Sequence, residues 1–331
     1  MKFIHTYEHI ISVENLLAAW QEFIVGKRNR MDVQKFELNL MSNIFALHGD
    51  LAAHIYRHSE YEAFNISDPK PRNIHKASVR DRLLHRAIYR VLYPFFDRRF
   101  IADSYSCRKR KGTHKAIAKF RSYAHIVSKN HMQTAWVLKC DIRKFFASID
   151  QEILMRIMLV HIPEKNILRL ISAIVGSFYM GERGRGLPLG NLTSQLFVNI
   201  YMNIFDQFMK HKIKAKYYIR YADDFVILSA DKAWLETTLR SVHAFLLEEL
   251  KLTLHPDKVS LQTFASGIDF LGWIHFPDHR VLRSATKKRM FRNLENTKGK
   301  NEVVLSYLGL MNHGNTQKLK QEIEQFSLQN Y

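Results

Sequence analysis

The sequence predicts an α+β fold with enough apolar material for a sizeable core. Hydrophobic residues make up 47% of the 331 residues, a share typical of globular domains. Apolar residues recur at helical spacing over long stretches, whereas strand-like runs flank two adjacent aspartates, Asp223 and Asp224, in "YIRYADDFVIL". The length corresponds to about two domains, and a single multi-lobed enzyme also fits.

The N-terminal part is predicted to be helical and to lead into a β-hairpin. Gly26 and the following "KRNR" divide residues 13–58 into two helices. In "YEAFNISDPKPRNIHKA", the turn signal "DPKP" separates two short alternating runs. Lys70 and Arg72 are therefore expected at the tip of a hairpin.

The middle of the chain is predicted to contain helices around one short strand. Ser78 with Asp81 resembles a capping box, and the helix that it opens has an apolar face formed by Leu84, Ile88, Val91, Leu92 and Phe95. A further helix is expected over "GTHKAIAKFRSYAHIV", and "AWVLKCD" is predicted to be a strand that ends in Asp141. Helices are expected from about 150 to 178.

The Gly-rich basic loop "GERGRGLPLGN" follows these helices. Asn191 is expected to cap the next helix, whose core face is formed by Leu196, Ile200, Phe205 and Phe208. "KYYIRY" and "FVILS" are predicted strands, and a helix is expected from about 231 to 250. Further strands are expected near "KVSLQTF" and "IDFLGWIHF", and the last 50 residues are expected to be basic and helical.

The charge balance indicates a polyanionic partner. The chain has 50 Lys and Arg against 31 Asp and Glu, a net charge of +19, with a pI near 9.8. Clustered basic residues gain free energy when they neutralise phosphates and release counterions. The alternative is a generically basic soluble protein, but here the basic residues alternate with aromatic residues throughout the chain.

Several classes of protein are disfavoured. Cys107 and Cys140 form no C-x-x-C pair, so a zinc ribbon and a disulfide framework are disfavoured and a reducing compartment is expected. The first residues do not resemble a signal peptide, and no apolar run is long enough to span a membrane. A cytoplasmic protein is expected. The G-K-[ST] of a P-loop and the G-x-S-x-G of a hydrolase do not occur in the sequence.

The aspartates point to a metal site. Asp223 and Asp224 lie between two predicted strands, and another strand ends in Asp141, so one sheet could bring the carboxylates together. Converging carboxylates repel one another unless cations lie between them, and Mg²⁺ prefers a few carboxylates together with phosphates and water. Two such ions support nucleotidyl transfer. For the four letters "YADD" alone, a plain Asp-rich turn remains an alternative.

The order of the motifs resembles that of reverse transcriptases. Asp141, "GLPLGNLTSQ", "YADD", "PDK" and "FLGW" follow one another as in that family, and "SYLGLMNHGNT" resembles the thumb segment of bacterial group II-intron-like members. Where the family usually reads Gln-Gly-x-x-x-Ser-Pro, this chain has "LGNLTSQ" from Leu189. That variant resembles the reverse transcriptases of diversity-generating retroelements, which copy a template RNA with errors at adenines and so diversify a gene.

The resemblance implies a fold, substrates and partners. It implies a right-hand polymerase fold with an N-terminal helical region over 1–60, fingers over 61–130, a palm over 131–277 and a thumb over 278–331. It implies two Mg²⁺ ions, dNTP substrates, a template RNA with its RNA–DNA hybrid, and a small basic accessory protein. Alternatives are a defence-associated or retron-type reverse transcriptase and a non-catalytic, RNA-binding maturase-like protein.

The resemblance also assigns roles to individual residues. It implies that Asp141 and Asp223 are the main metal ligands, with Ile142 and Asp224 beside them, and that Lys258 can protonate pyrophosphate. The residues that it places around the incoming dNTP are Lys70, Arg72, Ile142, Phe146, Leu189, Gly190, Ser194 and Gln195. The residues that it places along template and primer are Arg80, Tyr221, Phe270, Gly272 and Trp273.

Some of these residues have simpler interpretations. Phe146 resembles the steric gate that excludes a 2′-hydroxyl, but a core Phe also fits. Arg80 could instead pair with Asp81 at a helix start, and Phe270 and Trp273 could simply pack in the core. Lys258 and the Lys70–Arg72 tip could be solvated surface residues.

Overall fold

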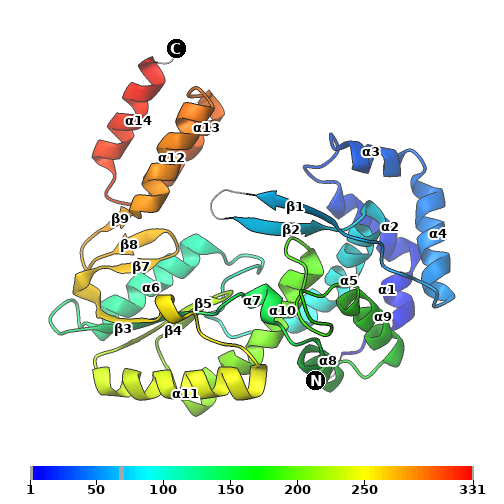
Figure 1. The fold of residues 1–331 in the computed structure, drawn as a ribbon, viewed down its shortest axis with the longest axis horizontal. Helices are drawn as coiled ribbons and strands as arrows, with labels where there is room; N and C mark the ends of the chain where they lie inside the picture. Colours follow the sequence, from blue (N-terminus) through cyan, green and yellow to red (C-terminus); the bar gives the residue numbers. More distant parts are fainter. Residues whose placement is uncertain (1–2, 67–70, 330–331) are drawn as a thin grey trace.

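The structure is a computed structural model that describes residues 3–66 and 71–329. Its helices and strands form a broad body from which the C-terminal helices project (Figure 1). Among the described helices, none is both long and apolar enough to cross a lipid bilayer.

The N-terminal region consists of helices and one hairpin. Its elements are α1 (Tyr7–Ile11), α2 (Val13–Phe23), α3 (Met31–Glu37), α4 (Leu40–Ala52), β1 (Glu62–Ile66), β2 (Arg72–Lys76) and α5 (Val79–Asp97). The predicted β-hairpin is confirmed, because β1 and β2 pair in antiparallel register. Lys70 lies outside the described residues. The bond from the N-cap side chain in the predicted capping box is also confirmed, since the Asp81 N–H donates to Ser78 Oγ at 3.2 Å.

The predicted break at Gly26 is confirmed, since α2 ends at Phe23 and α3 begins at Met31, but the single helix predicted after it is wrong, because α3 ends before α4 begins. The Asn43 side chain donates to the carbonyl of Phe36 at 2.9 Å. In a continuous helix that carbonyl would accept from the N–H of Leu40. A local side-chain bond therefore competes with the helical one and divides the segment.

The centre of the molecule is an antiparallel sheet in the order β4-β5-β3-β6. Its strands are β3 (Trp136–Asp141), β4 (Tyr218–Tyr221), β5 (Asp224–Ser229) and β6 (Ser260–Thr263). Side chains alternate between its faces. Val137 and Val226 pack with α6 (Thr113–Val127), whereas Leu138 and Ile227 belong to the core shared with α11 (Lys232–Leu250). Both faces are therefore buried, as α6 and α11 on opposite sides of the sheet indicate (Figure 1).

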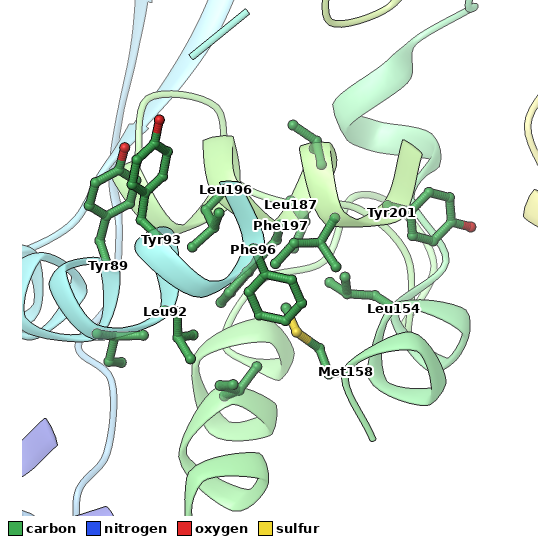
Figure 2. Packing of buried hydrophobic residues seen from close by; sticks show 14 of the residues in the cluster. Tyr89, Leu92, Tyr93, Phe96, Leu154, Met158, Leu187, Leu196, Phe197 and Tyr201 are labelled. Atoms are coloured by element: carbon green, nitrogen blue, oxygen red, sulfur yellow. The ribbon is translucent and has the colours of Figure 1, made fainter. Parts of the chain in front are cut away.

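The main core joins the sheet to the N-terminal helices. It is built around α8 (Gln151–His161), α9 (Lys165–Gly176) and α10 (Leu192–Gln207), which continues into a π-helical turn over Phe208–Lys212. Figure 2 shows how α5, α8 and α10 contribute apolar side chains to one cluster, among them Leu92, Phe96, Leu154, Met158, Leu196, Phe197 and Tyr201.

The remaining elements form a small second sheet and the C-terminal helices. The short elements are α7 (Phe145–Ser148), 3₁₀ turns at Pro256–Lys258 and Phe264–Ser266, and the strands β7 (Ile268–Phe270), β8 (Trp273–His275) and β9 (Arg280–Leu282). The helices are α12 (Ser284–Asn296), α13 (Asn301–Met311) and α14 (Gln317–Gln329). The described part of the last 50 residues is mostly helical as predicted, and only Leu282, the end of β9, belongs to a strand.

Candidate active site

Three aspartates meet at one end of the central sheet. Asp141, the last residue of β3, is the direct partner of Asp224, the first residue of β5. Asp223 lies in the two-residue turn between β4 and β5, and its carbonyl accepts a hydrogen bond from the N–H of Ile142 at 3.1 Å. The antiparallel register therefore brings together carboxylates that are far apart in the sequence.

Two of these carboxylates, those of Asp223 and Asp224, lie in an environment that disfavours their charged forms. The side chain of Asp224 is 20% exposed, but its Oδ1 is buried and has no hydrogen-bond partner among the described residues. Burial raises the pKa of Asp224 to about 7, although Lys139 opposes the shift with its Nζ 4.0 Å from Oδ2. Burial, and then the negative charge of Asp141, also raise the pKa of Asp223. Each carboxylate would therefore gain from a nearby cation.

Lys258 supplies one cation to this cluster. It ends the 3₁₀ turn at Pro256–Lys258, and its Nζ donates to Asp141 Oδ1 at 2.8 Å. The same segment is held against β3 because the N–H of His255 donates to the Asp141 carbonyl at 2.7 Å. Lys258 is exposed, so it is a surface lysine that is paired with Asp141.

The aspartates fit a magnesium site that substrate would complete. Among residues 3–66 and 71–329, no group of three His, Cys, Asp or Glu side chains is already arranged around a metal position. Mg²⁺ usually takes only one or two carboxylates and fills its other positions with phosphate oxygens and water. The unpartnered Oδ1 of Asp224 and the raised pKa of Asp223 are what such a carboxylate site shows without its cation.

The hairpin has a charge close enough to act on Asp223 and is hydrogen-bonded to the 187–191 loop. Arg72 is exposed at the start of β2, and its charge is among those that act on Asp223 and oppose the rise of its pKa. The N–H of His75 donates to the Leu189 carbonyl at 3.2 Å, and the His75 carbonyl accepts from Asn191 Nδ2 at 3.0 Å. The strand β2 is therefore hydrogen-bonded to this loop.

The prediction that the Asn191 side chain caps α10 is wrong. Asn191 occupies the N-cap position, but its side-chain Oδ1 accepts no hydrogen bond from the first turn of α10. The other end of the amide, Nδ2, donates to the His75 carbonyl. Gly190, with φ of +108°, passes so close to the hairpin that an added Cβ would lie 3.0 Å from Ile74 Cγ2. Farther along, Ser194 is buried in α10 and Gln195 is half-buried.

Phe146 follows Asp141 by five residues in the sequence, packs against the main core and is hydrogen-bonded to the start of this loop. It is half-buried in α7, and its ring meets that of Phe145 edge-on at a centroid distance of 5.6 Å. Its carbonyl accepts from the N–H of Leu187 at 2.8 Å. Phe145 is the core residue of the two, with 4% exposure.

Of the predicted template and primer residues, Tyr221 lies beside the aspartates, whereas Arg80 is held in ion pairs and Phe270 is buried in the core. Tyr221, half-buried beside the aspartates, accepts a hydrogen bond from Thr113 Oγ1 at 3.1 Å. Arg80 pairs with Asp50 at 2.5 Å and lies 3.7 Å from Asp81, as the ion-pair interpretation expected. Phe270 is fully buried, which fits the core interpretation.

The second sheet contacts the C-terminal helices through Trp273, which follows the turn between β7 and β8. Leu271 and Gly272 both have positive φ and form its two-residue turn. Trp273 is 3% exposed and packs so closely on Gly314 that an added Cβ there would lie 2.2 Å from its ring. Trp273 therefore fixes where the C-terminal helices join the second sheet.

Sequence reasoning missed the buried ion pair between Arg220 and Asp206. Both side chains are 0% exposed, and Nη2 of Arg220 lies 2.7 Å from Asp206 Oδ2. The available signal was an arginine inside the apolar strand "YYIRY" and an aspartate inside the apolar helix "NIFDQF". Charges at positions expected to be buried usually have a buried partner.

Comparisons with known proteins give the same family. The model of the family described as "Reverse transcriptase (RNA-dependent DNA polymerase)" matches residues 67–275. Protein YkfC of Escherichia coli is 25% identical over 258 residues, which cover 67% of this chain and 66% of that protein. The group II intron-encoded protein LtrA of Lactococcus lactis is 22% identical over 279 residues, covering 63% of this chain and 44% of LtrA. The matches thus cover less than two thirds of either relative.

Solved structures with a similar fold include telomerases. Telomerase from Candida tropicalis matches with a TM-score of 0.53 and 12% identity, over 67% of this chain and 48% of that one. Telomerase from Candida albicans matches with a TM-score of 0.52 and 14% identity, over 69% and 46%. The predicted α+β right-hand polymerase fold is confirmed. Because the family model covers more than half of its residues, the chain belongs to the reverse transcriptase (RNA-dependent DNA polymerase) family.

Proposed function

We propose that the chain is an RNA-directed DNA polymerase that extends a primer with dNTPs opposite a template RNA. The observation that carries the proposal is the cross-strand pairing of Asp141 with Asp224, with Asp223 in the adjoining turn. Binding of template RNA and the RNA–DNA hybrid is supported by the net charge of +19. It is also supported by the likeness to a telomerase solved with a fragment of telomeric RNA.

In this proposal the aspartates hold two Mg²⁺ ions, with Asp141 and Asp223 as the main ligands, Ile142 alongside and Asp224 in a supporting position. The ions would activate the attacking 3′-hydroxyl and stabilise the leaving pyrophosphate. Lys258 stays hydrogen-bonded to Asp141 until substrate arrives, and then donates a proton to the pyrophosphate. Its position beside the carboxylates supports this role.

The residues around the nucleotide have separate tasks. Arg72, with Lys70 from the hairpin, grips the triphosphate by charge-assisted hydrogen bonds. Phe146 lies under the sugar and excludes a 2′-hydroxyl. Leu189 and Gly190 contact the base pair that forms between the incoming nucleotide and the template. Ser194 and Gln195 follow them in α10 and support this surface. The hydrogen bonds between His75 and the loop support the idea that Leu189 and Gly190 move together with the hairpin.

The template and primer take the remaining positions. We assign Tyr221 and the Phe270–Trp273 turn with Gly272 to the primer side, where Phe270 and Trp273 act through packing. Arg80 acts on the template after leaving its pair with Asp50. In the same scheme residues 61–130 are fingers, 131–277 palm and 278–331 thumb, behind an N-terminal helical region over 1–60.

We further propose that the enzyme serves a diversity-generating retroelement in the cytoplasm, with errors at template adenines and a small basic accessory protein. The "LGNLTSQ" variant that begins at Leu189 supports this lineage. The free cysteines Cys107 and Cys140 support a reducing compartment. The alternatives remain a defence-associated or retron-type enzyme, and the intron-encoded relative LtrA favours a group II-intron-like origin for all of them.

The test is primer extension by the purified chain. A DNA primer annealed to an RNA template is supplied with dNTPs and Mg²⁺, and full-length cDNA is the expected product. A matched reaction with EDTA should give none. If the chain binds RNA but extends no primer on any template, the maturase-like alternative takes the place of the polymerase.

A further inference from the structure

The turn that carries Asp223 is held in an unfavourable backbone conformation. Ala222 and Asp223 form the two-residue connection between β4 and β5, and Ala222 has φ of +58°. A positive φ at the first position of such a turn ordinarily selects Gly. A non-Gly residue keeps this conformation only where surrounding contacts hold it.

One of those contacts comes from a buried guanidinium, beside the pairing of Tyr221 with Asp224 and the bond from the Ile142 N–H to the Asp223 carbonyl. Nη1 of Arg220 donates to the Ala222 carbonyl at 3.0 Å. Its Nε and Nη2 donate to the two carboxylate oxygens of Asp206 at 2.8 Å and 2.7 Å. Nη2 also donates to Ser104 Oγ at 3.1 Å. The planar fork of an arginine suits this combination, because its donors point in fixed and different directions.

Asp206 fixes the guanidinium to the body of the fold. It lies in α10, is 0% exposed, and accepts a further hydrogen bond from the hydroxyl of Tyr218 at 2.8 Å. Because α10 belongs to the main core, the position of Arg220 is determined by the best-packed part of the molecule.

The consequence is that the backbone of Asp223 is held on both sides. The Ala222 carbonyl belongs to the planar peptide unit that precedes Asp223, and Arg220 holds it. The carbonyl of Asp223 itself is held by the N–H of Ile142, the residue after Asp141. With both flanking peptide planes fixed, the direction of the Cα–Cβ bond of Asp223 relative to β3 is also fixed.

We propose that Arg220, oriented by Asp206, is a positioning residue that aims the Asp223 carboxylate at the reacting atoms. This inference rests on the proposed polymerase function. Arg220 touches neither substrate nor metal. It acts through the Ala222–Asp223 turn, and its loss should therefore affect metal use and turnover more than the binding of RNA.

The test variant is the double substitution R220M/D206N, which removes the bond to the Ala222 carbonyl without leaving an unpaired buried charge. Asn at 206 still accepts from Tyr218. The matched control is Y218F, which disturbs the same buried cluster but leaves the bonds from Arg220 to Asp206 and Ala222 in place. A third variant, R220K, keeps a positive charge beside Asp206 but lacks the planar fork of donors that reaches Asp206 and the Ala222 carbonyl at the same time.

For R220M/D206N we expect kcat for primer extension to fall ~10²-fold, as for other misplacements of a catalytic group. The Mg²⁺ concentration for half-maximal rate should rise ~10-fold, as when an outer partner of a metal ligand is lost. The rise in melting temperature that Mg²⁺ and dNTP together cause should shrink in parallel. RNA affinity should stay unchanged, and Y218F should behave like the wild type.

The inference is overturned if R220M/D206N melts at a lower temperature yet keeps the wild-type kcat and Mg²⁺ dependence, because Arg220 is then only structural. If the double variant does not fold, the same measurements on R220K test the inference. A higher Mg²⁺ concentration for half-maximal rate, with the wild-type melting temperature, supports it, and wild-type kinetics contradict it. An inactive wild-type chain would instead refute the polymerase function itself, so the two failures are distinguishable.

Discussion

Lys258 and Asp141 form a hydrogen-bonded ion pair at the end of the central sheet, with Nζ 2.8 Å from Oδ1. The two residues are 117 positions apart, and the pair exists only because the segment before β6 folds back on β3. The ammonium group therefore occupies the side of Asp141 where a cation is favoured.

Replacement of Lys258 by Ala should lower kcat by ~10²-fold, because a positioned proton donor contributes about that much. The Mg²⁺ requirement should not rise, since Asp141 loses a competing cation. Lys258→Arg is the control: it keeps the pairing with Asp141 but cannot give up a proton at neutral pH, so it should be slow as well. Steady-state primer extension across Mg²⁺ concentrations provides both quantities. An unchanged kcat in the Ala variant would limit Lys258 to neutralising Asp141.

Asp224 should make the metal-free protein less stable as pH rises. Burial raises the pKa of Asp224 to about 7, so between pH ~4 and ~7 the folded state binds more protons than the unfolded state, and stability falls through this window. Asp224→Asn removes this ionisation. The free energy of unfolding of the variant, relative to that of the wild type, should therefore increase by about 2 kcal/mol from pH 5 to pH 8.

Denaturation in EDTA at the two pH values measures this difference. The control is Asp257→Asn, since the side chain of Asp257 is 87% exposed in a nearby segment. Equal pH dependence of the wild type and Asp224→Asn would mean that Asp224 is solvated.

Phe146 should select the sugar. Phe146→Ala opens space for a 2′-hydroxyl, and rNTP incorporation relative to dNTP should rise by about tenfold or more, as expected when a steric contact of this size is removed. Phe146→Tyr keeps the ring and should keep the discrimination. Single-nucleotide incorporation with each substrate gives the ratio. Unchanged discrimination in a folded Ala variant would make Phe146 a core residue.

Leu189 should influence fidelity. Leu cannot hydrogen-bond, and one neutral hydrogen bond contributes ~0.5–1.5 kcal/mol, which is up to about tenfold in a ratio of rates. Leu189→Gln should therefore reduce errors opposite template adenine more than errors opposite the other bases. Leu189→Met is the volume-matched control. Sequencing of cDNA made with the cognate RNA and accessory protein gives the spectrum, and an unaltered spectrum would remove this loop from any role in fidelity.

The sequence predicted the parts of the site that depend on local pattern. The β4–β5 hairpin could be read from the apolar runs around Asp223 and Asp224, and the end of β3 from the run before Asp141. Their meeting followed from the assumption of one sheet, which the register confirms. The β1–β2 hairpin and the capping role of Ser78 were equally local.

Contacts between distant segments could not be predicted in this way. Asn191 is a favourable N-cap residue by its type and occupies the N-cap position, but its Oδ1 makes no capping bond, and its Nδ2 donates to His75, 116 positions away. Arg220 and Asp206 looked like isolated charges in apolar segments until the fold placed them together. The break between α3 and α4 was hidden because it arises from the side chain of Asn43 rather than from Gly or Pro.

The central claim is that the carboxylates at the ends of β3 and β5 carry out metal-dependent DNA synthesis on RNA. The most direct measurement is RNA-templated primer extension by Asp223→Asn, beside Asp257→Asn as control. We expect synthesis to fall by at least ~10³-fold, with RNA affinity unchanged because phosphate contacts supply most of it. Near-wild-type synthesis by a folded Asp223→Asn variant would contradict the account.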